Sequence, residues 1–189
     1  MFIVASVVLI LLITLSAGAV WAYLKLTSEP VTNTFSPDKD MNPTIEEDFQ
    51  DNIKSDVLVN VGDTGYSVYV RAAVVVTWAK ADGTVYATAP VAGTDYTLNW
   101  NGTDWFRASD GFYYHKVPVD SKGKTAKLIH SCTPVAGKAP DGGYTLHVKI
   151  VAQTIQALGA TDYDGTPAVE DAWKVVEVDS NTGYLLPSS

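Results

Sequence analysis

The stretch from Asn52 to Lys80, NIKSDVLVNVGDTGYSVYVRAAVVVTWAK, decides the fold of this chain. Both of its halves alternate between apolar side chains and others, and a period of two residues indicates β-strand. The alternating apolar residues are Val57, Val59 and Val61 in the first half, and Val68, Val70, Ala72, Val74, Val76 and Trp78 in the second. Between the halves stands Gly62–Gly65, GDTG, whose glycines accept positive φ, so the chain reverses there. We therefore expect one long β-hairpin with an apolar face.

The opposite side of the second half carries Tyr69, Arg71, Ala73, Val75 and Thr77, and it is polar at one end and apolar in the middle. This pattern predicts a central strand that is covered on both faces near Ala73 to Val75. A two-stranded unit is not stable alone in water, so further strands must close over it. The alternating segment Tyr144–Gln156 is the natural partner of this strand.

The composition restricts the class of protein. A chain of 189 residues is long enough for one well-buried domain with an N-terminal appendage. A formal net charge of −8 with scattered Lys and Arg argues against nucleic acid as a partner. Cys132 is the only cysteine in the sequence, so no intrachain disulfide can form, and we expect this residue to act as a small buried hydrophobe.

The N-terminal segment 1–22 is hydrophobic and reads as a signal or an anchor. No charged residue occurs from Phe2 to Ala22, and a run of this length is sufficient to cross a bilayer. Small residues before Tyr23 fit the specificity of a signal peptidase, which predicts cleavage between Ala22 and Tyr23. The alternative is a retained helix that holds the protein in the membrane through residues 2–24.

The segment 23–36 is predicted to be an extended arm that ends in a first strand, and residues 37–189 are predicted to form the folded domain. Alternation in the arm is short, is interrupted at Pro30, and then resumes. The residues that we expect to act in the arm are Tyr23, Leu24, Leu26, Val31 and Phe35.

The remainder of the domain contains many short β segments. Ser36–Gln50 reads as an acidic loop in which Ile45–Glu47 can pair at a sheet edge, and Asn101 and Gly102 form the strongest hairpin signal in the chain. The further expected strands are Tyr96–Trp100, Thr103–Arg107, Phe112–Val117 and Thr125–Cys132. Ala168–Val175 can form a short helix. About eight to ten strands at this spacing predict an all-β antiparallel sandwich of the jelly-roll or immunoglobulin-like type.

Aromatic residues gather in the segment that we expect to form a three-stranded meander. Trp100, Trp105, Tyr113 and Tyr114 carry most of this apolar surface. In a sandwich such residues mainly fill the core and cross-strand pairs. The alternative is an exposed aromatic surface that binds a glycan or a protein.

No catalytic, cofactor-binding or metal-binding motif is recognisable in the sequence. His115, His130 and His147 lie in separate predicted strands, and no His-Glu-x-x-His helix or Gly-x-Ser-x-Gly elbow is present. Asp162–Gly165 is similar to the start of a calcium loop, but it lacks the later ligands and reads as a solvated turn. We therefore expect a protein that is not an enzyme and that has no cofactor.

Seven short segments together resemble a known group of secreted proteins. They are Ala19–Leu24, Val31–Pro37, Val59–Gly65, Tyr69–Ala72, Gly111–Tyr114, Val151–Gln156 and Ala172–Trp173. Their order resembles the SipW-dependent secreted proteins of Gram-positive bacteria, which are related to the TasA and camelysin family. The resemblance implies a jelly-roll-like sandwich, export through a dedicated signal peptidase, and assembly into extracellular matrix fibres. Peptidase activity has been attributed to camelysin-like proteins, but no motif in this chain carries it.

These observations lead to one main hypothesis and two alternatives. A cleaved N-terminus would leave an extended arm able to complete the sheet of a neighbouring copy, giving a homopolymeric, biofilm-matrix filament at the cell surface. If the hydrophobic helix is retained, the protein is a membrane-anchored surface module or a pilin-like subunit. The third hypothesis is a binding module that uses the aromatic meander.

Overall fold

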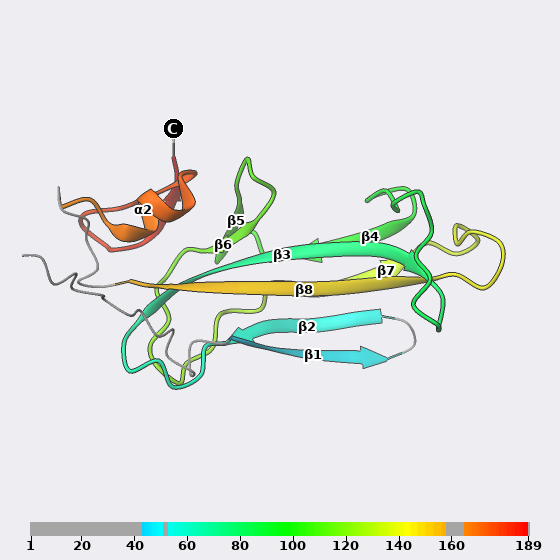
Figure 1. Cartoon of the computed structure of the whole chain (residues 1–189), viewed down its shortest axis with the longest axis horizontal. Coiled ribbons are helices and arrows are strands. Elements are labelled where there is room, and N and C mark those ends of the chain that lie inside the picture. The colour runs from blue at the N-terminus through cyan, green and yellow to red at the C-terminus, as the bar shows by residue number, and fades with distance from the viewer. Residues whose placement is uncertain (1–42, 51–52, 158–164, 189) are drawn as a thin grey trace, which may run out of the picture. The chain divides into compact units, whose positions relative to one another are not determined.

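The computed structural model describes residues 43–50, 53–157 and 165–188, all within the second of two units into which the chain divides, Pro37–Ser189. The hydrophobic segment 1–22, the cleavage position at Ala22 and Tyr23, and the arm 23–36 with its five named residues lie outside the described residues. The described residues form ten strands and one short helix (Figure 1), which confirms the all-β prediction.

The strands form two four-stranded antiparallel sheets and one small two-stranded sheet. Sheet A has the order β1 (Thr44–Gln50), β2 (Ile53–Asn60), β7 (Ile129–Pro134), β4 (Tyr96–Trp100). Sheet B has the order β5 (Trp105–Arg107), β6 (Tyr113–His115), β3 (Val68–Ala79), β8 (Thr145–Gln156). The C-terminal cap consists of α2 (Ala168–Trp173), β9 (Val176–Val178) and β10 (Leu185–Pro187).

The two longest strands form the centre of sheet B. β3 and β8 contain 12 residues each and pair over their whole length without a register shift. The prediction that Tyr144–Gln156 pairs with the second half of the central stretch is therefore confirmed. The predicted short helix is also present as α2, and the segment predicted as an acidic loop forms the edge strand β1.

The prediction of one long hairpin is wrong. β2 pairs with β1 and β7, whereas β3 pairs with β6 and β8, so the two halves of the central stretch lie in different sheets. Gly62 and Gly65 do adopt positive φ, at 69° and 71°, but the reversal is a corner that crosses from one sheet to the other. Alternation defines which side of each strand is apolar, and two apolar faces can meet across a sandwich as well as within one sheet.

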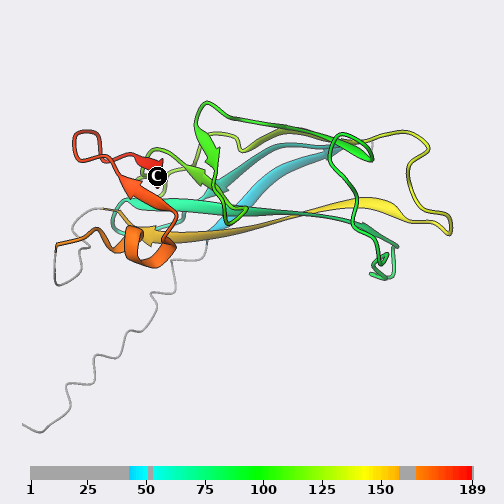
Figure 2. The same cartoon turned by 90° about the horizontal axis from the view of Figure 1, so that it is seen from above.

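Sheets A and B lie one over the other and enclose the main core (Figure 2). Val57 and Val59 from sheet A and Val70 and Ala72 from sheet B are completely buried in it. The two sheets therefore form a β-sandwich-like body.

The outer face of β3 is covered at a different place from the one predicted. Val75 is 45% exposed, so the prediction that the strand is covered on both faces near Ala73 to Val75 is wrong. The cap instead covers the other end of the strand, where Tyr69 is buried beside Val169 and Trp173 of α2. A C-terminal segment far away in sequence thus supplies the second apolar layer, and strand alternation alone does not reveal its position.

Arg71 lies at the border of the cap and joins it to sheet B. Its guanidinium carbon lies 4.4 Å from the ring centre of Phe112 and 4.9 Å from that of Trp173. The same group donates hydrogen bonds to the Tyr114 hydroxyl at 3.2 Å and to Oε1 of Gln153 at 2.8 Å. The hydrogen bonds and the contact with Phe112 fix the guanidinium on sheet B, and its contact with Trp173 joins the sheet to the cap.

The predicted hairpin at Asn101 and Gly102 is also wrong, because β4 pairs with β7 and β5 pairs with β6. Oδ1 of Asn101 accepts hydrogen bonds from the backbone N–H groups of Thr103 and Asp104, at 3.0 and 3.2 Å, and this Asx-type turn carries the chain from sheet A to sheet B. The turn residues were recognised correctly, but the connection closes one side of the sandwich instead of joining paired strands.

Candidate functional site: an open seam between two edge strands

The two long sides of the sandwich differ. On one side the chain passes directly from β4 to β5 and so connects the edges of sheets A and B. On the other side the edges are β1 and β8, and no strand pairing joins them within the described residues. We call the gap between β1 and β8 the seam.

A cavity of about 500 Å³ opens in the seam. Its lining residues come from both edge strands, from β2 and from the loops at the start of β8: Glu47, Lys54, Ala81, Gly143, Thr145, Leu146, His147 and Val148. The wall is thus partly apolar and partly charged.

The inner faces of sheet B are incompletely covered near the seam. Val74, Val76, Leu146 and Val148 pack against the main core but are only half-buried, whereas Val70 is completely buried. Additional apolar side chains could therefore be buried here without opening the existing core.

The backbone of β8 presents hydrogen-bonding groups to the seam. The N–H of Ala157, just after β8, donates to the carbonyl of Ser67, just before β3. Since these groups alternate in direction along a regular strand, the N–H and C=O groups of Leu146, Val148 and Ile150 point away from β3. The side chains of these same three residues point to the interior, as their burial indicates. A strand laid along β8 would therefore gain both backbone hydrogen bonds and core contacts.

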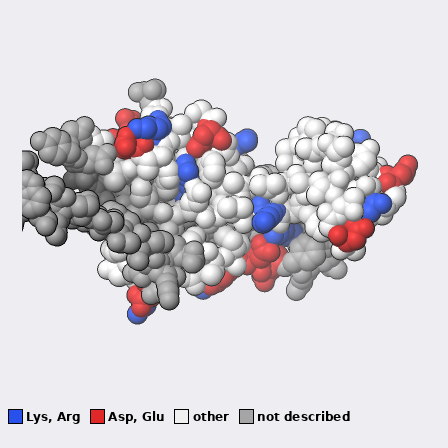
Figure 3. Space-filling model, viewed as in Figure 1, with Lys and Arg blue, Asp and Glu red and all other residues white. Residues whose placement is uncertain are grey.

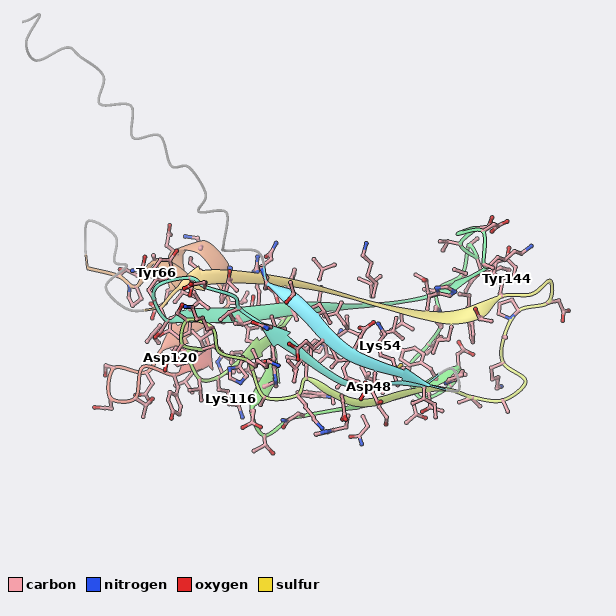
Figure 4. The ribbon with its side chains drawn as sticks, turned by 90° about the horizontal axis from the view of Figure 1, so that it is seen from below. Asp48, Lys54, Tyr66, Lys116, Asp120 and Tyr144 are labelled. Carbon is pink, nitrogen blue, oxygen red and sulfur yellow. The ribbon has the colours of Figure 1, made fainter. Side chains whose placement is uncertain are left out.

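Lys54 lies at the seam beside Glu47, and the sequence pattern did not predict its position. It is 8% exposed, and Nζ donates to Oε2 of Glu47 at 2.6 Å. Figure 4 shows Lys54 between the β1–β2 hairpin and β8. Asp56 has a φ of 54° and breaks the alternation of β2, so Lys54 and Val57 both face the interior. β2 is the second strand of sheet A, so Lys54 places its charge in the wall of the seam and not on the edge strand itself. A buried charge there opposes the entry of apolar side chains that bring no partner for it.

The four aromatic residues considered as a partner surface pack inside the protein. Trp105 and Tyr114 are completely buried, Tyr113 is 6% exposed, and Trp100 is half-buried. Trp100 and Tyr113 form an edge-to-face pair with ring centres 5.1 Å apart. Tyr114 belongs to the separate cluster under the cap. These residues present no common exposed surface, so they do not form the site.

The phenol of Tyr114 is held in its protonated form. Burial and the hydrogen bond to Asp110 raise the pKa of Tyr114 to about 12. Its hydroxyl donates to Oδ2 of Asp110 at 2.6 Å and accepts from Arg71. This network is structural and supports the cap.

The groups that could carry out chemistry are dispersed. Cys132 is 1% exposed and burial raises the pKa of its thiol, which confirms its prediction as a buried hydrophobe. His115, His130 and His147 lie on β6, β7 and β8. In the described part of the chain, no three His, Cys, Asp or Glu side chains converge as they would around a metal ion.

No protein-family model matches the chain, and no curated protein or solved structure matches it. The likeness to the SipW-dependent group therefore stays a prediction from sequence. Within residues 43–50, 53–157 and 165–188, no helix has the length and hydrophobicity that a membrane span requires.

Proposed function

We propose that this protein is a secreted structural subunit of an extracellular filament, polymerised by donor-strand exchange. A dedicated signal peptidase would release the chain at Ala22 and Tyr23, and the arm 23–36 of one copy would then enter the seam of the next. The filament would belong to the matrix or cell surface of a Gram-positive bacterium, as the resemblance in sequence implies.

The order of the strands supports an incomplete jelly roll. In a regular jelly roll of eight strands, the first pairs with the last, the second with the seventh and the third with the sixth. The pairs β2–β7 and β3–β6 follow this rule. The fourth and fifth strands, which also pair in a regular jelly roll, lie here in different sheets, with β5 beside β6. β1 pairs with β2 and leaves the edge of β8 without its usual partner. The place beside β8 that a first strand normally takes is not filled by any strand among the described residues. This is the observation that carries the proposal.

The arm has the pattern that the seam requires. Leu24 and Leu26 lie two residues apart, so in an extended conformation both point to the same side. Against the half-buried Leu146 and Val148, burial of two Leu side chains would contribute roughly 3 to 6 kcal/mol before ordering costs. Backbone hydrogen bonds to the free edge of β8 would add directionality.

The position of the seam favours a head-to-tail assembly. β1 runs from the cap end toward the loop 80–95 (Figure 1), so the chain enters this strand at the cap end. The lining of the seam cavity includes Thr145–Val148 at the start of β8, which pairs with the opposite end of β3. A segment that leaves one copy on the cap side and enters the next near the other end makes a heterologous contact. Such a contact repeats without closing and produces a filament.

The experiment compares two double variants of the arm in the exported protein. Leu24→Ser with Leu26→Ser should abolish filaments and leave a folded monomer, because the apolar anchors are lost. Lys25→Ser with Thr27→Ser changes the other side of the arm and should leave filaments in place. Negative-stain microscopy and sedimentation provide the measurement.

Two outcomes would overturn the proposal. One is continued polymerisation after deletion of Tyr23–Thr27, which would show that the arm is not required. The other is an N-terminus at Met1 in the mature protein together with monomers at high concentration, which is the result expected of a membrane-anchored module.

A further inference from the structure

Exposed apolar side chains gather at the two ends of the described domain. Seven large hydrophobic residues are exposed in the described part of the chain, and five of them lie in two groups. The first group is Val85, Tyr86 and Val91, in the loop 80–95 between β3 and β4, which we call the tip. The second group is Tyr184 and Leu186, in the cap.

The tip is an ordered loop, so its apolar side chains are held at the surface by its own backbone. The N–H of Tyr86 donates to the carbonyl of Trp78 at 2.9 Å, and the N–H of Val91 donates to Oδ2 of Asp95 at 2.8 Å. The ring of Tyr86 also packs edge-to-face on Tyr144, with centres 5.1 Å apart. Val85 and Val91 nevertheless remain 58% and 56% exposed.

The tip and the cap lie at opposite ends of the sandwich (Figures 1 and 2). Figure 4 places Tyr144, which packs on the tip, at the end opposite to Tyr66. At the tip end, Figure 3 shows an uncharged area with charged groups of both signs around it. Exposed apolar groups of this kind are typical of protein contacts.

The cap patch is likewise built on ordered backbone. The N–H of Leu185 donates to the carbonyl of Lys116, and Leu186 pairs with Glu177 in the β9–β10 sheet. Leu185 is completely buried, whereas its neighbours Tyr184 and Leu186 are 43% and 40% exposed. The alternation of this short strand thus directs Tyr184 and Leu186 outward.

We propose that the tip of one copy docks on the cap patch of the next copy, as a second contact of the filament. This inference rests on the proposed function, since the arm would bring the cap end of one subunit to the seam end of its neighbour. Ala81, in the tip, also lines the seam cavity, so the two contacts would be continuous. Because the two patches belong to opposite ends, the contact is heterologous and repeats along the filament.

The test uses charge at the centre of each patch in the exported protein that begins at Tyr23. Val85→Lys and Leu186→Lys should each weaken polymer formation by about tenfold or more in critical concentration, because a charge would be buried without a partner. The double variant Val85→Lys with Leu186→Glu should recover much of the loss. Val75→Lys and Val151→Lys are the controls, since these valines are 45% and 42% exposed on the outer face of sheet B, away from both patches.

A second measurement separates this contact from the arm mechanism. A synthetic peptide of residues 23–36 is titrated into the chain that lacks Tyr23–Thr27, with and without Val85→Lys, and circular dichroism verifies that each variant is folded. We expect equal peptide affinity in the two chains. Equal peptide affinity with unchanged polymerisation of Val85→Lys and Leu186→Lys would overturn the tip–cap contact and leave the arm mechanism standing. Absence of peptide binding to either chain would overturn both proposals.

Discussion

His115 is held neutral by its hydrogen bonds. Nδ1 lies 2.6 Å from the carbonyl oxygen of Val117, which can only accept, so Nδ1 carries the hydrogen. Nε2 then accepts the backbone N–H of Ala126 at 3.2 Å. Burial lowers the pKa of His115 from 6.5, and the hydrogen bond to Val117 and the charge of Asp104 oppose this change only in part.

Acid should therefore destabilise the fold through His115. Because its pKa is lower in the folded than in the unfolded chain, the unfolded state binds more protons below about pH 6.5, and stability falls as the pH drops. The variant His115→Gln replaces the imidazole by a side chain that does not titrate. It should reduce the pH dependence of the free energy of unfolding between about pH 7.5 and about pH 5, even if the variant is less stable at neutral pH. Thermal unfolding at several pH values provides the measurement.

The control for this prediction is His130→Gln, since His130 is exposed on β7. Since His130→Gln leaves His115 in place, the loss of stability on acidification should persist in this variant. If His115→Gln and the unchanged protein lose stability in parallel on acidification, His115 is not the acid-sensitive group.

Arg71 contributes to the attachment of the cap through its contact with Trp173. Arg71→Lys retains the charge but loses the planar contact with the rings of Phe112 and Trp173 and the paired hydrogen bonds, so we expect a loss of about 1 to 2 kcal/mol in the free energy of unfolding. Urea unfolding followed by tryptophan fluorescence measures it. The matched change Arg107→Lys affects an exposed arginine 5.6 Å from the ring centre of Tyr113, and it should cost less than about 0.5 kcal/mol. Equal losses in the two variants would contradict the role assigned to Arg71.

At the scale of the element, β2 turns the charged side chain of Lys54 toward the interior, where it forms part of the wall of the seam. Lys54→Met would replace a buried ammonium by an apolar side chain of similar length, while Glu47, whose side chain is 35% exposed, stays in contact with water. Removal of one partner of an ion pair is costly when the other charge is left buried, and here Glu47 keeps its contact with water, so the free energy of unfolding should change by less than about 1 kcal/mol or rise.

The same variant should make the seam more receptive to apolar segments of other copies, because a buried charge is removed from its wall. The comparison uses two chains that both lack Tyr23–Thr27, one with Lys54→Met and one without it. Sedimentation velocity should show more dimers and aggregates in the chain with Lys54→Met. Lys149→Met, which changes an exposed residue on the outer side of β8, is the control and should remain monomeric. A large loss of stability in Lys54→Met would instead show that the ion pair holds the edge together.

Elements were easier to predict from the sequence than their partners. The alternation of β3 and β8 was sufficient to predict both strands, since each carries an almost continuous apolar face. Their similar length made them natural partners. The positions of β2 beside β7 and of β4 beside β7 could not be predicted, because alternation assigns faces and not neighbours. The inward position of Lys54 depends on the positive φ of Asp56, a residue type that adopts this conformation only occasionally. The seam therefore became recognisable only once the strand order was known.

At the scale of the whole domain, the chain combines one closed side, one open side and two apolar ends. The β4–β5 connection closes the first side, and the cap protects part of the outer face of sheet B. The uncovered surfaces have a direction, since the seam cavity and the tip lie near one end of the domain and the cap patch lies at the other. This asymmetry is the property that a polar, unbranched assembly of identical subunits requires.

The pairing of β3 with β8 has a consequence for the timing of folding. Arg71 and Gln153 meet across this pair although they are 82 residues apart in sequence. Contacts of such high sequence separation make folding slow, because a long loop must close before they are gained. A polypeptide that emerges N-terminus first, from a ribosome or a translocation channel, cannot complete sheet B until Gln156 has appeared. Most of the polypeptide must therefore have emerged before the native state can form, so the chain lacks its native sheet B until that point.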